Sequence, residues 1–289
     1  MTLSRPVFRF APSPNGELHL GHALSALVGY EQARAAGGRF LLRIEDIDVG
    51  RTRPEFVAGI FEDLRWLELE WEEPVLFQSQ RMEAYRAAAR RLEALGLAYP
   101  CFATRSEIEA AAGGASDQDG APLYPGLWKG RTQAEIAERR AARVPAALRI
   151  DMVAAQRAVA EKLRGLPLTF VEVADAGAPQ TVDAHPERWG DAVVVRKDVP
   201  TSYHLAVVVD DAWQGVTHVV RGRDLYAATD LHRLLQVLLD LPEPTYHHHR
   251  LIVDETSRKL AKSAGDTSLR ALREQGLLPA EVRRLVGLA

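Results

Sequence analysis

The chain has 289 residues, of which 47% are hydrophobic and 26% are charged, a balance typical of a globular protein with a sizeable core. Its 36 basic and 39 acidic side chains give a net charge of −3, which excludes a general polyanion binder of the histone kind. Cys101 is the only cysteine, and this count excludes a disulfide scaffold and a thiolate-rich zinc site. Because the N-terminus does not resemble a signal peptide and no apolar run reaches membrane-spanning length, we expect a cytoplasmic protein without a membrane partner.

The first hundred residues predict an α/β fold. A strand ends at the breaker pair Pro12 and Pro14, an apolar helix follows, and a second strand leads into acidic residues. Strand, helix and strand at this spacing form a βαβ unit, which implies a parallel sheet. Apolar residues at helical spacing predict two more helices before Gly96. The predicted strands are 6–11 and 40–44, and the predicted helices are 18–35, 54–64 and 82–95.

The composition changes after about residue 99. Residues 111–130 are rich in glycine, proline and alanine and predict a loop, and the section from about 100 to 190 has the pattern of an inserted subdomain. A regular α/β pattern then returns. Across these two sections the sequence predicts strands at 147–150, 168–173, 192–196, 206–210 and 251–253, and helices at 131–143, at 227–239 and up to Leu285.

The tetrapeptide His19-Leu20-Gly21-His22 stands after a predicted strand and at the start of a predicted helix. Helix N-termini attract phosphate, and two imidazoles one turn apart can donate hydrogen bonds to its oxygens. The glycine between them allows a flat base to approach the backbone. The alternative is a surface pair of helix-capping histidines.

A second motif, Lys259-Leu260-Ala261-Lys262-Ser263, lies in a polar loop near the C-terminus. Two lysines three residues apart on such a loop suit a mobile clamp on a transferring phosphate. A solvated lysine loop is the alternative.

Together the two motifs resemble the HIGH and KMSKS motifs of class I aminoacyl-tRNA synthetases. Several segments are similar to the glutamyl and glutaminyl branch in particular. They are 9–22 (RFAPSPNGELHLGH), 42–48 (LRIEDID), 203–206 (YHLA), the Asp210-Asp211 pair and 215–224 (GVTHVVRGRD). The chain ends soon after the second motif, and Val207 stands where enzymes that charge tRNA with glutamate usually place asparagine. In these two respects the sequence resembles the glutamyl-queuosine tRNA(Asp) synthetase family, a truncated relative of glutamyl-tRNA synthetase.

The resemblance implies a doubly wound parallel α/β sheet of the class I synthetase, Rossmann type, with an inserted α+β subdomain and a short C-terminal helical segment. We expect residues 1–99 and 190–245 to form the catalytic domain and residues 100–189 to form the inserted connective subdomain. Residues 246–289 would hold the KMSKS-type loop and the helical segment, without an anticodon-binding domain.

The implied function is ATP-dependent activation of L-glutamate without tRNA, followed by transfer of glutamate to the queuosine base in the anticodon of tRNA(Asp). ATP with Mg²⁺ is the implied co-substrate, and we expect a monomer. Three alternatives stay open at this stage: a glutamyl-tRNA synthetase that charges tRNA(Glu), a glutamate ligase with another acceptor, and a synthetase-like RNA-binding protein without catalysis.

The resemblance also implies roles for individual residues. Arg9 and Arg221 supply fork-shaped cations that suit the two carboxylates of glutamate, Glu45 can pair with its α-ammonium group, and Tyr203 adds a hydroxyl. The backbone from Arg9 to Ser13 would line the same pocket. Singly, each of these side chains could equally be a structural one. The implied catalytic residues are His19, His22, Lys259 and Lys262, the ATP-binding residues are His19, Gly21, His22 and Lys262, and the glutamate-binding residues are Arg9, Phe10, Ala11, Pro12, Ser13, Glu45, Tyr203 and Arg221.

No metal site is expected. Members of the family often bind structural zinc through a C-x-C pair and a later Y-x-x-x-C segment, but Ala103 and Trp128 replace two of the four ligands here. Cys101 and Tyr124 alone cannot close a four-coordinate site.

Two further features are ambiguous. The three histidines of 246–249 (YHHH) alternate in direction in an extended chain, so one near the nucleotide and two in structural or exposed positions is the preferred interpretation. The arginines of the 131–143 helix could contact tRNA phosphates or form a solvated basic face.

Overall fold

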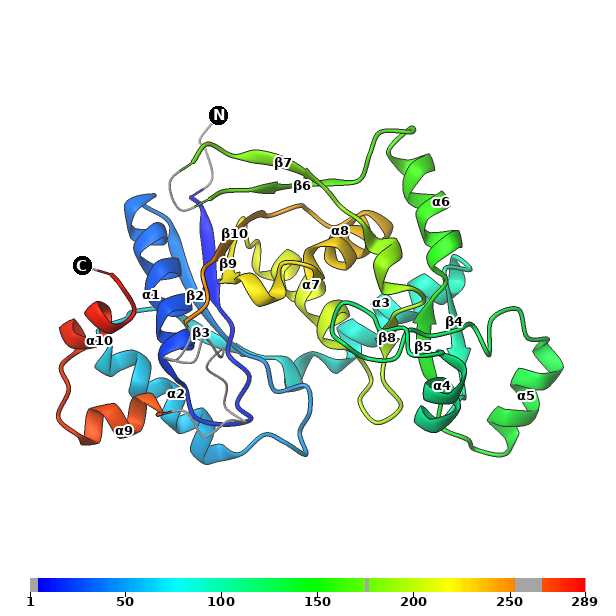
Figure 1. Ribbon diagram of the computed structural model, residues 1–289, viewed down its shortest axis with the longest axis horizontal. Helices are drawn as coiled ribbons and strands as arrows, with labels where there is room; N and C mark the ends of the chain where they lie inside the picture. Colours follow the sequence, from blue (N-terminus) through cyan, green and yellow to red (C-terminus); the bar gives the residue numbers. More distant parts are fainter. Residues whose placement is uncertain (1–4, 175–176, 253–266, 289) are drawn as a thin grey trace.

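The computed structural model describes residues 5–174, 177–252 and 267–288. Its main element is a seven-stranded sheet with the strand order β3-β2-β1-β9-β10-β6-β7, and a three-stranded antiparallel sheet, β4-β5-β8, lies at the far end of the molecule (Figure 1). The first six strands of the large sheet are parallel to their neighbours, and β7 runs antiparallel to β6.

The helices and strands alternate along most of the chain. The strands are β1 (Val7–Phe10), β2 (Arg39–Ile44), β3 (Glu72–Phe77), β4 (Ala98–Cys101), β5 (Ala147–Ile150), β6 (Thr169–Glu172), β7 (Gln180–Asp183), β8 (Val193–Val195), β9 (His218–Gly222) and β10 (Thr245–His249). The α-helices are α1 (Leu20–Ala35), α2 (Pro54–Trp66), α3 (Met82–Ala94), α4 (Arg105–Ala111), α5 (Gln133–Ala141), α6 (Met152–Lys162), α7 (Tyr203–Gln214), α8 (Ala228–Leu238), α9 (Leu269–Glu274) and α10 (Pro279–Leu285).

The parallel sheet is covered on both faces, as the sequence predicts. Phe8 and Phe10 of β1 point to the face on which α1 packs, and they join one continuous apolar core with it. Arg9, between them, points to the other face and reaches Asp211 on α7. Because residues alternate sides along a strand, this single strand contributes to two separate layers. The strand order reverses between β1 and β9, which places a topological switch point at the centre of the sheet.

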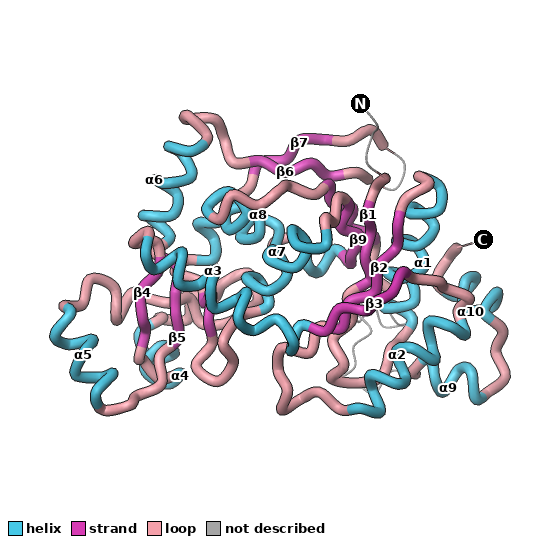
Figure 2. The backbone as a smooth tube through the Cα atoms, turned by 180° about the vertical axis from the view of Figure 1, so that it is seen from behind, coloured by secondary structure: helices cyan, strands magenta, loops and turns pink. Residues whose placement is uncertain are grey.

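The three-stranded sheet and its helices form the opposite end of the molecule from α1 and α2 (Figure 2). It takes β4 and β8 from the edges of the predicted insertion, 100–189, and β5 from its interior. The pair β6 and β7, also inside that range, extends the large sheet instead. The predicted division of the chain into domains stays a prediction.

Two predicted strands are wrong. Residues 206–210 belong to helix α7, which the Ser202 side chain caps at its start and Gly215, with φ of +67°, ends. Its valines are buried against neighbouring helices, and this packing outweighs their preference for strands. Residues 251 and 252 are not in a strand, because β10 ends at His249, where its partner β9 ends at Gly222. Val253 lies outside the described residues.

The C-terminal helices pack beside α1 and α2 (Figure 1). Leu269 and Val282 are fully buried in the same core as α1. The backbone N–H of Leu269 donates to the carbonyl of Leu18 (2.8 Å), and Ser268 forms an isolated bridge with His19. The C-terminal segment therefore supports the entry to α1. Within the described ranges, none of the helices has the length and apolarity that crossing a membrane requires.

Candidate active site

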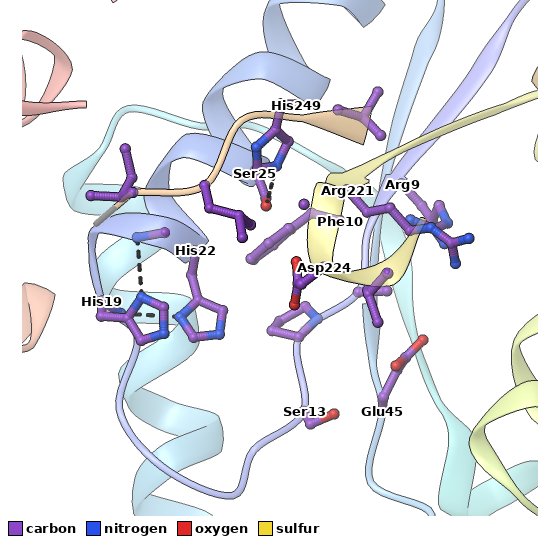
Figure 3. A pocket seen from close by; sticks show the side chains of 18 of the residues that line it. Arg9, Phe10, Ser13, His19, His22, Ser25, Glu45, Arg221, Asp224 and His249 are labelled. Atoms are coloured by element: carbon purple, nitrogen blue, oxygen red, sulfur yellow. Dashed lines mark hydrogen bonds between the residues drawn. The ribbon is translucent and has the colours of Figure 1, made fainter. Parts of the chain in front are cut away.

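An open cavity of about 460 Å³ lies at the carboxyl ends of β1, β2 and β9, beside the N-terminus of α1 (Figure 3). In doubly wound sheets, ligands bind at this edge, next to the point where the strand order reverses. All the predicted ATP- and glutamate-binding residues that the structure describes line this cavity. They are Arg9, Phe10, Ala11, Pro12, Ser13, His19, Gly21, His22, Glu45, Tyr203 and Arg221. The role of each toward a ligand stays a prediction.

His19 and His22 form the N-terminal cap of α1. The His19 ring accepts a hydrogen bond from the backbone N–H of Gly21 (3.0 Å), and Nδ1 of His22 accepts one from the backbone N–H of His19 (3.2 Å). Since Nδ1 is the acceptor in both rings, each neutral ring carries its proton on Nε2. The ring centroids are only 3.9 Å apart. Two ring donors therefore stand together at the positive end of a helix, an arrangement suited to phosphate.

Gly21 is required by the first of these rings. A Cβ at this position would lie 2.9 Å from Cε1 and 3.1 Å from Nδ1 of His19. Any other residue would therefore displace the ring from its capping position.

The side of the cavity that carries Arg9 and Glu45 rests on a buried ion-pair network. Arg9 contacts both carboxylate oxygens of Asp211, at 3.1 and 3.4 Å. Arg43, which is completely buried, bridges Asp211 (2.7 Å) to Glu45 (3.1 Å). Two cations and two anions balance each other here, which is the condition for keeping charges out of water.

The pKa values follow from burial and from this network. Burial raises the pKa of the Glu45 carboxyl, although Arg43 and Arg9 oppose the shift. Burial also acts on Asp211, but the charges of Arg9 and Arg43 outweigh it and lower the pKa of that carboxyl. The ionised form of Glu45 would therefore gain from an additional cation in the cavity, and an α-ammonium group supplies one.

Arg221 has a different environment from Arg9. It donates to Nε2 of His248 (3.0 Å), to the hydroxyl of Thr229 (2.8 Å) and toward Nδ1 of His232 (3.2 Å). Across the described part of the chain, no carboxylate lies within ion-pair distance of Arg221. A buried cation without a protein carboxylate beside it favours an anionic ligand.

Tyr203 is the predicted glutamate-binding residue that carries a phenolic hydroxyl, and Phe10 and Ser13 line the cavity with it. Tyr203 is the first residue of α7 and lines the cavity. Its ring lies beside that of His232, with the two ring centroids 5.6 Å apart. Burial raises the pKa of its hydroxyl, so this group stays protonated and can donate a hydrogen bond. In Figure 3, His19 and His22 lie on the opposite side of the cavity from Arg9 and Arg221.

Three more residues shape the site but are not among the predicted site residues. Arg43 and Asp211 hold Arg9 and Glu45 in place, and His249 lines the cavity and bonds to Ser25 of α1 (2.6 Å). The sequence offers a signal for each, since Arg43 and Asp211 fall in segments that resemble the synthetase family and His249 belongs to the histidine run 246–249. Val207 is buried among apolar residues and does not line the cavity.

Lys259 and Lys262 lie outside the described residues. Their predicted part in catalysis stays a prediction.

The four positions that the resemblance relates to a zinc site form an apolar cluster. Cys101, Ala103 and Tyr124 are buried together, and Trp128 packs against them. The Cys101 thiol lies 3.3 Å from the Tyr124 hydroxyl, which also accepts a hydrogen bond from the backbone of Trp128. These side chains do not fit a zinc ion. Among the residues that the structure describes, no group of three or more histidine, cysteine, aspartate or glutamate side chains could hold a metal.

The histidines of β10 are all buried. His249 faces the cavity, whereas Nδ1 of His247 lies 2.7 Å from the carbonyl of Val173 and Nδ1 of His248 lies 2.7 Å from Glu172. One histidine beside the cavity and two in structural positions agrees with the preferred interpretation, and none of the three is exposed.

The fold and this cavity define the class of protein. A family model described as tRNA synthetases class I (E and Q), catalytic domain, matches residues 7–289, and the chain belongs to this family. The predicted family and the predicted doubly wound α/β fold are confirmed.

Individual relatives and a solved structure are also similar to this chain. A protein from Rhodobacter capsulatus named glutamyl-Q tRNA(Asp) synthetase is 46% identical over 98% of this chain and 100% of that relative. A protein of the same name from Nocardia farcinica is 41% identical over 96% of this chain and 82% of that relative. The crystal structure of the glutamate-tRNA synthetase from Elizabethkingia anophelis matches with a TM-score of 0.76 and 25% identity. This match covers 99% of the present chain but 62% of that structure.

Proposed function

We propose that the chain activates L-glutamate with Mg-ATP in the absence of tRNA and transfers the glutamyl group to the queuosine base in the anticodon of tRNA(Asp). The observation that carries the proposal is the composition of one cavity. It combines two capping histidines at a helix N-terminus with buried arginines and a buried carboxylate, and these groups match the charges of ATP and glutamate.

In the first step, a carboxylate oxygen of glutamate attacks the α-phosphorus of ATP, and pyrophosphate leaves. Arg9 and Arg221 bind the carboxylates of glutamate, Glu45 pairs with the α-ammonium group, and Tyr203 donates a hydrogen bond. The buried ion pairs of Arg9 and Glu45 support this role, because they fix both side chains before the substrate binds.

The phosphates of ATP bind at the N-terminus of α1. His19 and His22 donate from their rings to the phosphate oxygens, and Gly21 leaves space for the ring of His19. Charge develops on these oxygens as pyrophosphate leaves, so donors held in place by the helix cap stabilise the transition state more than the ground state. Lys259 and Lys262 also bind the transferring phosphate, as the resemblance to KMSKS implies.

In the second step, a hydroxyl of the queuosine cyclopentenediol attacks the mixed anhydride of glutamyl-adenylate, and AMP leaves. The names of the relatives support this acceptor. The chain aligns with 100% and 82% of two proteins named glutamyl-Q tRNA(Asp) synthetase. We also propose a cytoplasmic monomer whose domains divide at about residues 100, 190 and 245.

The activation step is tested by glutamate-dependent ATP–pyrophosphate exchange with the protein alone. Exchange should appear without tRNA, and glutamine and aspartate should be poor substrates, because neither presents a carboxylate at the distance that glutamate does. If exchange required tRNA(Glu), an ordinary glutamyl-tRNA synthetase would be the better assignment.

The acceptor is tested with labelled glutamate and purified tRNAs. tRNA(Asp) that carries queuosine should be labelled, whereas the same tRNA with unmodified guanine and tRNA(Glu) should not. Periodate treatment of the tRNA should block transfer, because it cleaves the cyclopentene diol. Equal labelling of both forms of tRNA(Asp) would exclude queuosine as the acceptor and leave glutamate activation intact.

A further inference from the structure

Three neutral groups surround the buried guanidinium of Arg221. They are the imidazoles of His232 and His248 and the hydroxyl of Thr229, and we call this set the Arg221 cradle. Its contacts are 3.2 Å to Nδ1 of His232, 3.0 Å to Nε2 of His248 and 2.8 Å to Oγ1 of Thr229. His232 and Thr229 come from α8 and His248 from β10, so two elements that follow β9 in the chain close around one side chain.

The hydrogen bonds fix the protonation of both imidazoles. A guanidinium can only donate, so the ring nitrogens that face Arg221 must be acceptors without a proton. His248 then carries its proton on Nδ1, where Glu172 accepts it at 2.7 Å. His232 carries its proton on Nε2, which lies 3.2 Å from Nδ1 of His204. Both rings are therefore neutral in this arrangement.

Burial and the neighbouring cation keep them neutral. Burial, and after it the charge of Arg221, lower the pKa of His232 well below its usual range. Burial lowers the pKa of His248 to about 4, although its hydrogen bond to Glu172 opposes the shift. At neutral pH the cradle therefore contributes no charge of its own beside Arg221.

This environment contrasts with that of the other arginine in the cavity. Asp211 contacts Arg9 at 3.1 Å and neutralises it. The carboxylate of Glu172, in contrast, is separated from Arg221 by the whole imidazole of His248. Three hydrogen bonds thus orient Arg221, but no carboxylate of the cradle balances its charge, which can therefore interact with a ligand.

We propose that His232 and His248 are positioning residues that set the preference for a carboxylate over an amide at the end of the amino-acid substrate, because they orient Arg221 without neutralising it. This inference rests on the proposed function and takes the side-chain carboxylate of glutamate as the one that Arg221 binds. Neither histidine contacts the substrate in this scheme. An anionic group in the position of either ring would neutralise the charge of Arg221 within the protein. Glutamate would then no longer be preferred over glutamine as a substrate.

The test compares two variants of nearly equal size, His232→Asp and His232→Asn. The aspartate is held ionised by Arg221, whereas the asparagine oxygen replaces the neutral acceptor. In ATP–pyrophosphate exchange with the full chain, we expect the aspartate variant to raise the KM for glutamate about 10- to 100-fold, the range for losing a charge-assisted contact. The kcat/KM ratio of glutamate over glutamine should fall by about tenfold or more. The asparagine variant should recover most of this preference, and the KM for ATP should change little in either.

A second pair and a direct measurement cover the case in which His232→Asp does not fold. His248→Glu and His248→Gln should differ in the same direction. In the wild-type protein, ¹⁵N NMR of the histidine rings at neutral pH should show His232 protonated on Nε2 only and His248 on Nδ1 only. An imidazolium at either position would overturn the inference, as would equal glutamate preference in the aspartate and asparagine variants. Absence of exchange in the wild type would instead contradict the proposed function.

Discussion

Asp211 offers the clearest test of how the site is held together. Its side chain is 5% exposed and contacts two buried arginines, at 3.1 Å from Arg9 and 2.7 Å from Arg43. In the Asp211→Asn variant, Arg9 loses its carboxylate partner and Arg43 keeps Glu45 as its direct one. Breaking a buried ion pair by removing one partner typically costs about 3–5 kcal/mol of unfolding free energy.

Urea unfolding measures this effect. With a denaturant dependence of about 3 kcal/mol per molar, the loss corresponds to a midpoint lower by about 1 M or more. Glu83 is the matched control, because it also contacts two arginines, Arg86 and Arg90, but its side chain is 71% exposed. Glu83→Gln should leave the midpoint unchanged, since exposed ion pairs are screened by water and salt. Similar midpoints for both variants would refute the argument that burial gives the Asp211 network its strength.

The sign of the pH dependence follows from the same contacts. The pKa of Asp211 is lowered in the folded protein, so its stabilising effect is present above the unfolded value of about 3.9 and is lost as the pH falls through the folded value. Wild-type protein should therefore lose stability in acid over this window. The asparagine variant should lose less, because an amide does not titrate.

Three further predictions concern other parts of the molecule. His22→Ala should reduce glutamate-dependent exchange by about two orders of magnitude or more, which is the scale for losing one donor to a charged transition state. Glutamate binding in the absence of ATP should change little. Exchange at the wild-type rate would mean that His19 and His22 form only a structural cap. Protein purified without chelators should contain no stoichiometric zinc by elemental analysis, because Ala103 and Trp128 occupy two ligand positions; one equivalent would indicate a rebuilt site. Burial raises the pKa of Asp63 to about 6 in spite of Arg273 at 3.2 Å. Stability should therefore fall as the pH rises from about 4 to 6, and Asp63→Asn should abolish this fall in urea midpoints measured at both ends.

The sequence predicts the parts of the fold that local patterns encode. The strand at 6–11, the helix at 18–35 and the strand at 40–44 correspond to β1, α1 and β2, because breakers and periodicity mark them directly. Residues 206–210 mislead, since a run of valines favours a strand locally and the helix depends on the Ser202 cap and on burial. The central strand β9 has no predicted counterpart. Its five residues carry a histidine, an arginine and a glycine, which obscure the apolar run of a buried strand.

The same distinction between local patterns and long-range packing applies to the residues of the site. The motif 9–22 holds its own geometry, because the cap formed by His19 and His22 involves contacts only two and three residues apart. The partner of Arg9, in contrast, is 202 residues away along the chain. A pattern within one segment can indicate that Arg9 binds an anion. Only the folded structure shows that Asp211 already occupies one side of it.

Arg9 and Arg221 have the same side chain, and both are buried at the edge of one cavity, yet the structure distinguishes them. The arginine with a carboxylate partner can orient a substrate carboxylate but gains little from its charge, because that charge is already balanced. Arg221, which is held by neutral imidazoles, loses the favourable interaction of its charge with water on burial. An anion that enters the cavity restores a favourable interaction with that charge. Selectivity for a charged side chain therefore depends on the neighbours of Arg221 as well as on the arginine itself, and His232→Asp should weaken the preference for glutamate while both arginines stay in place.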